Sequence, residues 1–567
     1  MTEHDERPAG RPEYDGLRFG PEVLLPGSVI GHYHQQDDLI TAEFSGESVL
    51  TGRLVGLADA AGVINASYCQ VMHDGEIVAG RCVSTPTVLA DGRVQLSEHW
   101  HRIDGTSGIS QITEIAELAD LTGEPAIEEA PALTSAESPV GSPEAGPDER
   151  PHLLLISTGD RLFREYLLAP IAEQYRIHLF LAAQPLWETQ YVDAVTVLAD
   201  TIDAEEMIAA AAELNGRDRI DGVLCWDEAR VLAASKVAQS LGLPGGDPEM
   251  VLRCRDKHLT RELAAAAGVP QPRSVLVASV DEAATVAADI GYPVVLKPRG
   301  VAASLGVVLV GDEAELRTLF DFAHDTTAPG AILGDSIVLV EEYADGPEIS
   351  VDCAVFGGEV LPICLAHKEI GYPPYFEEVG HLVDGADPML TDPAFRQILE
   401  AAHQALGFSD GMTHTEFRLT PSGPKLIEVN ARLGGDLIPY LGLRATGIDP
   451  GLAAAAVACG RRPAVAPDRK RFGAVRFCYV PYEMTIGAIS FESSRMPAGV
   501  DLAVVRAAPG QHHSPPPAGT VWGRIAYVTA VADTELDART TIAAAEAALV
   551  VAEAAEGEPV QSGVPRP

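Results

Sequence analysis

The spacing of apolar residues changes character part-way along the chain. In residues 16–118, short runs in which apolar and polar residues alternate are separated by Gly and Asp-Gly, as in residues 48–55. Alternation with a period of two predicts half-buried strands. Residues 73–76 and 90–93 contain the Asp-Gly pairs that favour tight β-hairpins. Because no helical spacing interrupts these runs, the segment is predicted to be an antiparallel β-barrel or sandwich domain.

From residue 151 onward, apolar strands alternate with segments of helical spacing. This alternation predicts a parallel, doubly wound α/β sheet in residues 151–249. The turn at residues 157–160 lacks the G-x-G-x-x-G pattern, so a dinucleotide site is not expected there. The predicted strands are 152–156, 177–182 and 222–225, and the predicted helices are 163–175 and 207–214.

Composition sets the remaining domain boundaries. Residues 119–150 are rich in Pro and Glu without an apolar period, which indicates a disordered acidic linker. Residues 250–462 form an α+β region that holds most of the recognisable chemistry. Residues 463–555 are predicted to form a C-terminal α+β domain that closes with an Ala-rich helix near 540–552, and residues 556–567 a disordered tail.

Charge and cysteine content narrow the function classes. The 567 residues are 46% hydrophobic and 22% charged, which is ordinary for a globular protein of several domains. The net charge of −42 repels phosphate backbones and anionic lipid, so we expect neither nucleic acid nor membrane as a partner. The eight cysteines include no C-x-x-C pair, and neither a signal peptide nor a membrane-spanning run is evident. We therefore expect a cytoplasmic protein.

The strongest candidate site is a predicted hairpin formed by residues 413–432. A turn centred near Ser422 places Glu416 directly opposite Glu428. Two like charges across a hairpin are destabilising unless a cation lies between them. The hairpin therefore predicts a cation site, with a solvated hairpin and exposed charges as the alternative.

The groups around these two glutamates fit a metal-bound nucleotide. Glu428, Asn430 and Arg432 alternate along one strand and share a face. Mg²⁺ (or Mn²⁺) takes carboxylate and amide oxygens and fills its other positions with phosphate and water. Glu416, Glu428 and Asn430 are therefore the candidate metal ligands. Arg432 adds a fork for a phosphoryl group, and the Gly434-Gly435 pair that follows lets the backbone approach a ligand closely.

An earlier segment carries candidate phosphate-binding residues. In residues 292–307, an apolar strand ends in Lys297 and is followed by a small-residue loop that contains Ser304 and Gly306. The N–H groups of such a loop can fold over phosphates while the lysine reaches an oxygen. A plain hairpin is the alternative.

A third segment carries candidate nucleoside-binding residues. An apolar strand ends in Glu341, Glu342 and Tyr343, whose backbone is placed to read an adenine edge. Glu348, after the Gly turn, is a candidate acceptor from ribose hydroxyls. An acidic turn on the surface is the alternative.

These three segments, in this order, resemble the ATP-grasp superfamily. A fourth element, Asp256-Lys257 followed by the stretch ending at Pro272, places Lys257 at the family's first nucleotide-binding lysine. The resemblance covers residues 151–480. It implies a Rossmann-like domain at 151–249, an ATP site between two α+β lobes at 250–462, Mg²⁺ on the hairpin ligands, and an acyl-phosphate intermediate.

A narrower resemblance is carried by the P-x-F-x-E-x-G-H pattern that ends at His381. It is similar to the dipeptide-forming L-amino acid ligases. In that family the matching Glu378 and His381 line the substrate pocket, and the matching Arg432 lies beside the transferring phosphoryl group. The substrate residues implied are Glu378, His381, Gly434, Gly435 and Asp436, and the catalytic residues implied are Arg432, Glu378 and His381. A structural histidine is the alternative for His381.

The resemblance implies an ATP-dependent carboxylate–amine ligase that joins amino acids and releases ADP and phosphate. Its partners would be small-molecule carboxylate and amine substrates, and we expect a homodimer. One alternative is a ligase with another acceptor, as in carboxylases or purine-pathway enzymes. In another, the N-terminal β-domain, which weakly resembles a lipocalin-like domain, is a separate ligand-binding or docking module. His32/His34 and His99/His101 each share a strand face, but no third metal ligand is evident.

Overall fold

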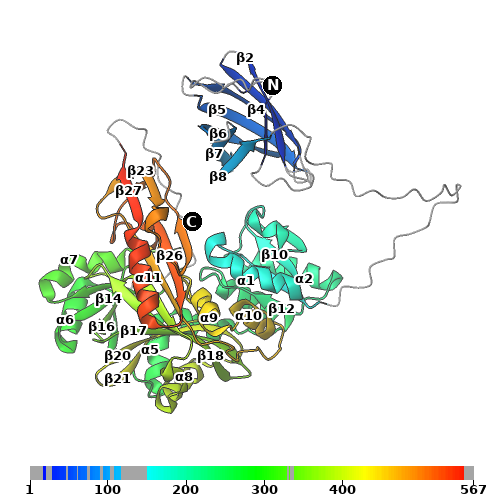
Figure 1. Ribbon diagram of the computed structural model, residues 1–567. Helices are drawn as coiled ribbons and strands as arrows, with labels where there is room; N and C mark the ends of the chain where they lie inside the picture. Colours follow the sequence, from blue (N-terminus) through cyan, green and yellow to red (C-terminus); the bar gives the residue numbers. More distant parts are fainter. Residues whose placement is uncertain are drawn as a thin grey trace, which may run out of the picture. The chain divides into compact units, whose positions relative to one another are not determined.

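The chain forms two compact units, residues 1–141 and 142–567, and each is described by itself (Figure 1). The computed structural model describes residues 14, 17–20, 29–36, 38–45, 49–59, 62–72, 77–89, 93–102, 107–115, 150–328, 331 and 338–554. The predicted tail at 556–567 lies outside this range, as does all of the predicted linker except Arg150.

The first unit is a closed antiparallel barrel, which confirms the predicted β-domain. β1 pairs with both β2 and β8, so the described strands leave no open edge. Tyr33 is buried between the exposed His32 and His34, as alternation requires. The predicted turn at 73–76 lies outside the described residues, as do residues 90–92 of the predicted turn at 90–93. The strands are β1 Arg18–Gly20, β2 Ile30–Gln36, β3 Leu39–Ser45, β4 Val49–Ala58, β5 Ile64–Met72, β6 Ile77–Val88, β7 Val94–Arg102 and β8 Ser107–Glu114.

The second unit opens with the predicted parallel sheet. Its strand order is β11-β10-β9-β12, and helices pack on it through buried Leu, Ile and Ala side chains. From β9 the chain adds β10 and β11 on one side and then returns to add β12 on the other, so the switch point lies between β9 and β12. At such a point the carboxyl ends of the parallel strands leave a crevice. The elements are β9 His152–Ile156, α1 Arg161–Gln174, β10 Arg176–Leu181, η2 Trp187–Gln190, β11 Ala194–Val197, α2 Ala204–Arg217, β12 Gly222–Leu224 and α3 Val231–Leu241.

A small lobe follows, built on a four-stranded antiparallel sheet of order β13-β16-β14-β15. α6 and α7 cover it with apolar side chains such as Ala287 and Phe320. Asp256 caps α5 by accepting from the backbone N–H groups of His258 and Leu259, which fixes the helix start at Lys257. The elements are α4 Pro248–Arg255, α5 Lys257–Ala266, β13 Ser274–Val277, α6 Val280–Ile290, β14 Val294–Pro298, β15 Val308–Val310, α7 Glu313–His324 and β16 Val338–Glu342.

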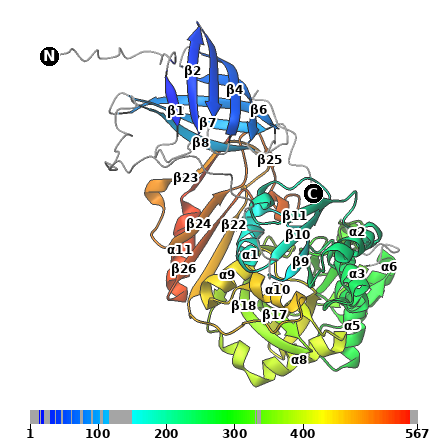
Figure 2. The ribbon, with the colours of Figure 1, turned by 90° about the vertical axis from the view of Figure 1, so that its right-hand side faces the viewer.

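An eight-stranded antiparallel sheet forms the larger lobe, in the order β21-β20-β17-β18-β19-β22-β26-β24. Its last three strands come from the C-terminal segment (Figure 2), and α11 lies along β26 (Figure 1). The elements up to residue 458 are β17 Glu348–Phe356, β18 Glu359–Gly371, β19 Glu377–Asp384, η3 Pro388–Thr391, α8 Pro393–Leu406, β20 Gly411–Thr420, β21 Gly423–Asn430, α9 Ile438–Thr446 and α10 Pro450–Ala458.

The C-terminal segment differs from its predicted helix at one end. α11 spans Glu535–Ala547, whereas the predicted helix ran to residue 552. Leu549–Glu553 is instead strand β27, because its β-branched run pairs with β23. The other elements here are β22 Phe472–Cys478, β23 Met484–Phe491, η4 Ser493–Arg495, β24 Val500–Val505, β25 His512–His513, η5 Val521–Gly523 and β26 Ala526–Ala532. Among the described residues, every helix is too short or too polar to cross a bilayer.

Candidate active site

The β20–β21 hairpin places Glu416 and Glu428 across from each other, as the sequence predicts. Thr420 pairs with Gly423 at the turn, so regular pairing would set Glu416 against Ile427. A β-bulge after Glu416 shifts the register by one residue and brings Glu428 opposite it instead. Directly opposed residues present their side chains on the same face of the sheet. The bulge therefore brings the two carboxylates to one face.

Each of these glutamates lies beside a buried lysine from another element. Lys368 Nζ, on β18, is 2.8 Å from Glu416 Oε1, and Lys257 Nζ, at the start of α5, is 2.9 Å from Glu428 Oε1. Burial opposes a charge on Glu416, but Lys368 and His414 outweigh it and hold the pKa of Glu416 well below its usual value. Glu416 is therefore ionised at neutral pH and adjoins cationic groups.

Lys368 contacts three carboxylates at once. Its Nζ lies 2.8 Å from Glu416, 3.0 Å from Glu378 and 3.3 Å from Glu348. Burial disfavours the charged lysine, yet the three carboxylates raise its pKa well above the usual value. Arg418 Nε also lies 3.1 Å from Glu348 Oε2. These ion pairs hold three of the predicted site residues together at one wall of the pocket.

His414 and Asp352 support the hairpin from behind. His414 Nδ1 is 2.6 Å from Asp352 Oδ1, and its Nε2 is 3.2 Å from Glu416 Oε1. Burial disfavours the imidazolium, but the two carboxylates raise the pKa of His414 to about 9. A Cβ at Gly434 would lie 2.8 Å from His414 Nδ1, so the chain requires glycine here to pass the pair.

A second cluster of charges surrounds Lys297 at the end of β14. Lys297 Nζ lies 2.6 Å from Glu341 Oε2, and Arg261 Nε lies 2.7 Å from Glu341 Oε1. Burial lowers the pKa of Lys297 to about 8, although Glu341 favours its charged form. Burial alone would raise the pKa of Glu341, but Arg261 and Lys297 lower it to about 2. With Lys257 nearby, this end of the pocket has more cations than carboxylates.

The small-residue loop after β14 is anchored by the start of α5. The backbone N–H of Lys257 donates to the Arg299 carbonyl, and Lys257 Nζ donates to the Val301 carbonyl at 2.7 Å. Ala303 and Ser304 both adopt positive φ, at 60° and 54°. This conformation is costly for residues other than glycine and is typical of functional loops that surrounding structure holds in place.

Most of the predicted site residues line one pocket between the two lobes. Three predicted residues do not line it: Gly306 faces Thr326 and Pro298, Gly434 packs behind the hairpin, and His381 is buried beside Glu378 and Asp436. The predicted residues that line the pocket are Lys257, Lys297, Ser304, Glu341, Glu342, Tyr343, Glu348, Glu378, Glu416, Glu428, Asn430, Arg432, Gly435 and Asp436.

Arg432 is held by a residue of the parallel-sheet domain. Its Nε lies 2.7 Å from Glu228 Oε2, and Arg255 Nε lies 3.2 Å from Glu228 Oε1. Burial would lower the pKa of Arg432, but Glu228 outweighs it and raises the pKa. Glu228 lies four residues after the end of β12, in the segment that leaves the carboxyl edge of the parallel sheet. That sheet therefore orients the guanidinium that the hairpin carries into the pocket.

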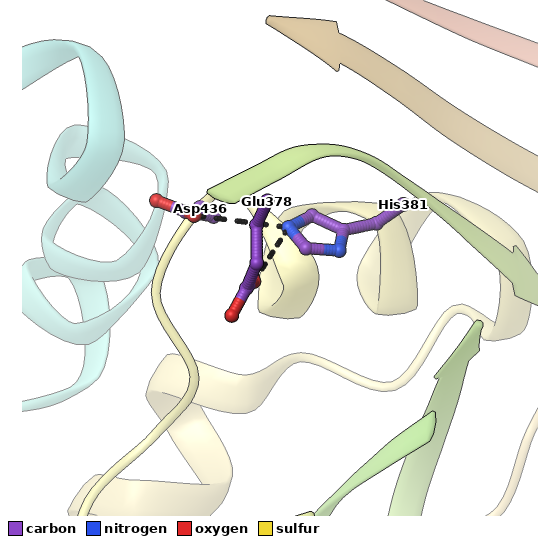
Figure 3. Close-up of side chains that lie close together, drawn as sticks. All are labelled: Glu378, His381 and Asp436. Atoms are coloured by element: carbon purple, nitrogen blue, oxygen red, sulfur yellow. Dashed lines mark ion pairs between the residues drawn. The ribbon is translucent and has the colours of Figure 1, made fainter. Parts of the chain in front are cut away.

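Glu378, His381 and Asp436 come together at the other end of the pocket (Figure 3). His381 Nε2 lies 3.4 Å from Glu378 Oε2 and 3.8 Å from Asp436 Oδ2. The His381 side chain is fully buried, and neither ring nitrogen has a hydrogen-bond partner among the described residues. A buried imidazole that lies between two carboxylates without a hydrogen bond is suited to meet a polar ligand group.

Several residues of this site were not identified by the sequence analysis, among them Lys368, His414, Glu228 and Arg524. Lys368 lies six residues before the P-x-F-x-E-x-G-H pattern and just after the apolar run 361–366, so a lysine at the end of an apolar run was an available signal. Glu228 lies 204 residues before Arg432, and Arg524 lies 88 residues after Asp436. Local spacing carries no signal for either pairing.

Comparison with known proteins agrees with this architecture. Residues 14–115 match the family model of the avidin-like proteins, and residues 290–439 match that of the ATP-grasp domain. The barrel thus matches an avidin-like family, whereas its sequence suggested a lipocalin-like one. The chain therefore carries an ATP-grasp domain, which lies in the two lobes that follow the parallel sheet.

The more specific relatives are ligases. Alanine–anticapsin ligase of Bacillus subtilis is 29% identical over 46% of this chain and 58% of its own length. Human carnosine synthase 1 is 32% identical over 45% of this chain and 32% of its own length. The L-amino acid ligase of Bacillus licheniformis matches 72% of this chain and 99% of its own with a TM-score of 0.58 at 20% identity, a likeness of fold. The chain thus spans less than two thirds of the length of alanine–anticapsin ligase and of carnosine synthase 1.

Proposed function

We propose that the chain is an ATP-dependent carboxylate–amine ligase that joins amino acids through an acyl phosphate and releases ADP and phosphate. The observation that carries the proposal is the single pocket in which Lys257, Lys297 and the Glu416/Glu428 pair meet. The similarity to alanine–anticapsin ligase and to an L-amino acid ligase supports the substrate class.

The hairpin fits a divalent cation. Glu416, Glu428 and Asn430 offer carboxylate and amide oxygens on one pocket wall, which is the donor chemistry of Mg²⁺ or Mn²⁺. Both carboxylates already adjoin lysine ammonium groups, so the wall tolerates positive charge. A bound cation would offset the charge of the ATP phosphates.

The remaining steps use the chain's own residues. Lys297 and Lys257 bind phosphate oxygens, and Arg432, oriented by Glu228, stabilises charge on the phosphoryl group during transfer to the substrate carboxylate. The Ser304 loop covers the phosphates and excludes water, because a hydrolysed acyl phosphate wastes ATP. Glu378 or His381 orients the attacking amine or accepts its proton.

A pairwise amino-acid screen tests the proposal. ADP and phosphate are measured for each pair with MgATP, and products are identified by mass spectrometry. We expect equal amounts of ADP, phosphate and a dipeptide for at least one pair, and none with Glu428→Gln. ADP release without an amide product, or no release with any pair, would contradict the amino-acid ligase. Light scattering on the same sample tests the proposed homodimer.

A further inference from the structure

Arg524 connects the C-terminal segment to the substrate end of the pocket. It directly follows η5 and precedes β26, outside the region that matches the ATP-grasp family model. Arg524 is only 3% exposed, so its guanidinium is buried within the protein. The proposed reaction described above assigns it no part.

All three guanidinium nitrogens of Arg524 are engaged. Nη1 and Nη2 donate to the two carboxylate oxygens of Asp436 at 2.7 and 2.8 Å, the paired geometry that only arginine offers. Nη2 also donates to the Glu378 carbonyl at 2.9 Å, and Nε donates to Tyr479 Oη at 2.9 Å. The guanidinium carbon lies 3.8 Å from the centre of the Phe477 ring. Arg524 therefore links Glu378 and Asp436 of the pocket wall to Phe477 and Tyr479.

The backbone it holds is strained. Asp436 and Leu437 both have positive φ, at 52° and 63°, immediately before α9 begins. Residues other than glycine keep this conformation only where the surrounding structure holds them in it. The paired bonds from Arg524 supply that constraint at Asp436, and they fix the direction of its carboxylate.

The consequence concerns the space around His381. Glu378 and Asp436 flank His381 Nε2 from two sides (Figure 3), and Arg524 ties the first by its backbone and the second by its side chain. A change at Arg524 alters both sides of this space together, and it reaches Glu416 of the hairpin through Glu378 and Lys368 rather than by a direct contact. No contact in the described residues joins Arg524 to Lys257, Lys297 or Glu428.

We infer that Arg524 is a positioning residue that sets the geometry of the amino-acid subsite formed by Glu378, His381 and Asp436. The inference rests on the proposed ligase function for its substrate class. Arg524 touches neither the nucleotide-binding lysines nor the candidate metal ligands, so its loss should affect amino-acid binding and spare ATP binding.

Two variants of the full chain test this role. Arg524→Met keeps the apolar stem and removes every polar bond, and Arg524→Lys keeps the charge but cannot form the paired bonds. We expect the KM of the amino acid at this subsite, for the best pair in the screen, to rise about tenfold in Arg524→Met and to be only partly restored in Arg524→Lys. The Kd of MgATP should stay within about twofold.

A matched control is Arg444→Met. Arg444 Nη2 lies 2.6 Å from Asp501 Oδ1 and also joins α9 to the C-terminal segment, but it does not line the pocket. The Arg444→Met change should leave the KM of the amino acid and the Kd of MgATP unchanged. In an Asp436→Asn background, Arg524→Met should raise KM by less than about twofold further, because the two residues act as one unit.

Hydrogen exchange gives a readout that does not depend on activity. Arg524→Met should speed exchange in peptides covering residues 376–381 and 433–437, and Arg444→Met should not affect the first of these. Unchanged exchange and KM would overturn the inference, as would faster exchange throughout with loss of MgATP binding. If the wild type joins no amino acids but the exchange pattern holds, the ligase function fails while the positioning role stands.

Discussion

Two buried lysines mark two ends of the pocket that differ in charge balance. Lys297 shares one carboxylate, that of Glu341, with Arg261, whereas Lys368 alone contacts three carboxylates. The Lys297 end thus has an excess of cations and the Lys368 end an excess of anions. The same residue type therefore has a pKa lowered to about 8 at one end and raised well above its usual value at the other.

From this contrast we propose a ligand for each end. An excess of cations in a chain with a net charge of −42 provides local attraction for phosphate. An excess of ionised carboxylates suits a divalent cation or a substrate ammonium group. Lys368 offsets part of the repulsion among the three carboxylates, and Arg418 beside Glu348 and His414 beside Glu416 offset more of it. The free protein thereby keeps the acidic wall together and still favours an incoming cation.

The largest effect is expected from Glu428→Gln, which removes the carboxylate that lies opposite Glu416 and contacts Lys257. Without that carboxylate the proposed cation is poorly held, and we expect ADP release with both substrates to fall by about a thousandfold. Glu359→Gln is the control, because Glu359 forms only a solvent-exposed ion pair with Arg462. Near-normal turnover of Glu428→Gln would contradict the metal assignment.

Arg432→Ala tests whether this guanidinium acts in phosphoryl transfer rather than in ATP binding. Arg432 is proposed to act during phosphoryl transfer, so single-turnover rates should fall about a hundredfold while the Kd of ATP changes by less than about threefold. Glu228→Gln should show a weaker form of the same pattern, because it loosens the guanidinium without removing it. Arg462→Ala serves as the control. Unchanged turnover with equal ATP binding would refute the role of Arg432 in the transition state.

How much of this site the sequence predicted depends on the distance between partners along the chain. The Glu416–Glu428 pair was predictable because a short turn determines it, although the β-bulge that completes the register was not. The strand ending in Lys297 and the barrel strands followed from local patterns in the same way. The ATP-grasp fold itself came from several such motifs in order, supported by the family resemblance.

Long-range pairs were beyond the reach of local patterns. The three carboxylates on Lys368 come from β17, β19 and β20, which meet only once the sheet has formed. The same holds for Glu228 on Arg432 and Arg524 on Asp436. At the C-terminus, an Ala-rich stretch favoured a helix through residue 552, but pairing with β23 made its last residues a strand.

The charge on Lys297 predicts that ATP affinity depends on pH. Burial lowers its pKa to about 8, so its positive charge is present below that pH and lost above it. ATP affinity of the free protein should therefore decrease from about pH 7 to about pH 9, by about tenfold if the charged form is required. Isothermal titration at several pH values measures this. In Lys297→Arg the guanidinium keeps its charge, and the decrease should disappear; an equal decrease in that variant would assign it to another group.

The smallest effect is expected from removing the barrel. Both ends of the pocket are built from residues after 150, and the barrel forms a compact unit of its own. Deleting residues 1–141 retains Arg150, whose guanidinium bonds the Ala172 and Tyr175 carbonyls at the end of α1. We expect ADP release with amino acids to stay within about twofold of the full chain. Full activity would make the barrel a recruiting or regulatory module, whereas a large loss would show that it contributes to the pocket that the two lysines define.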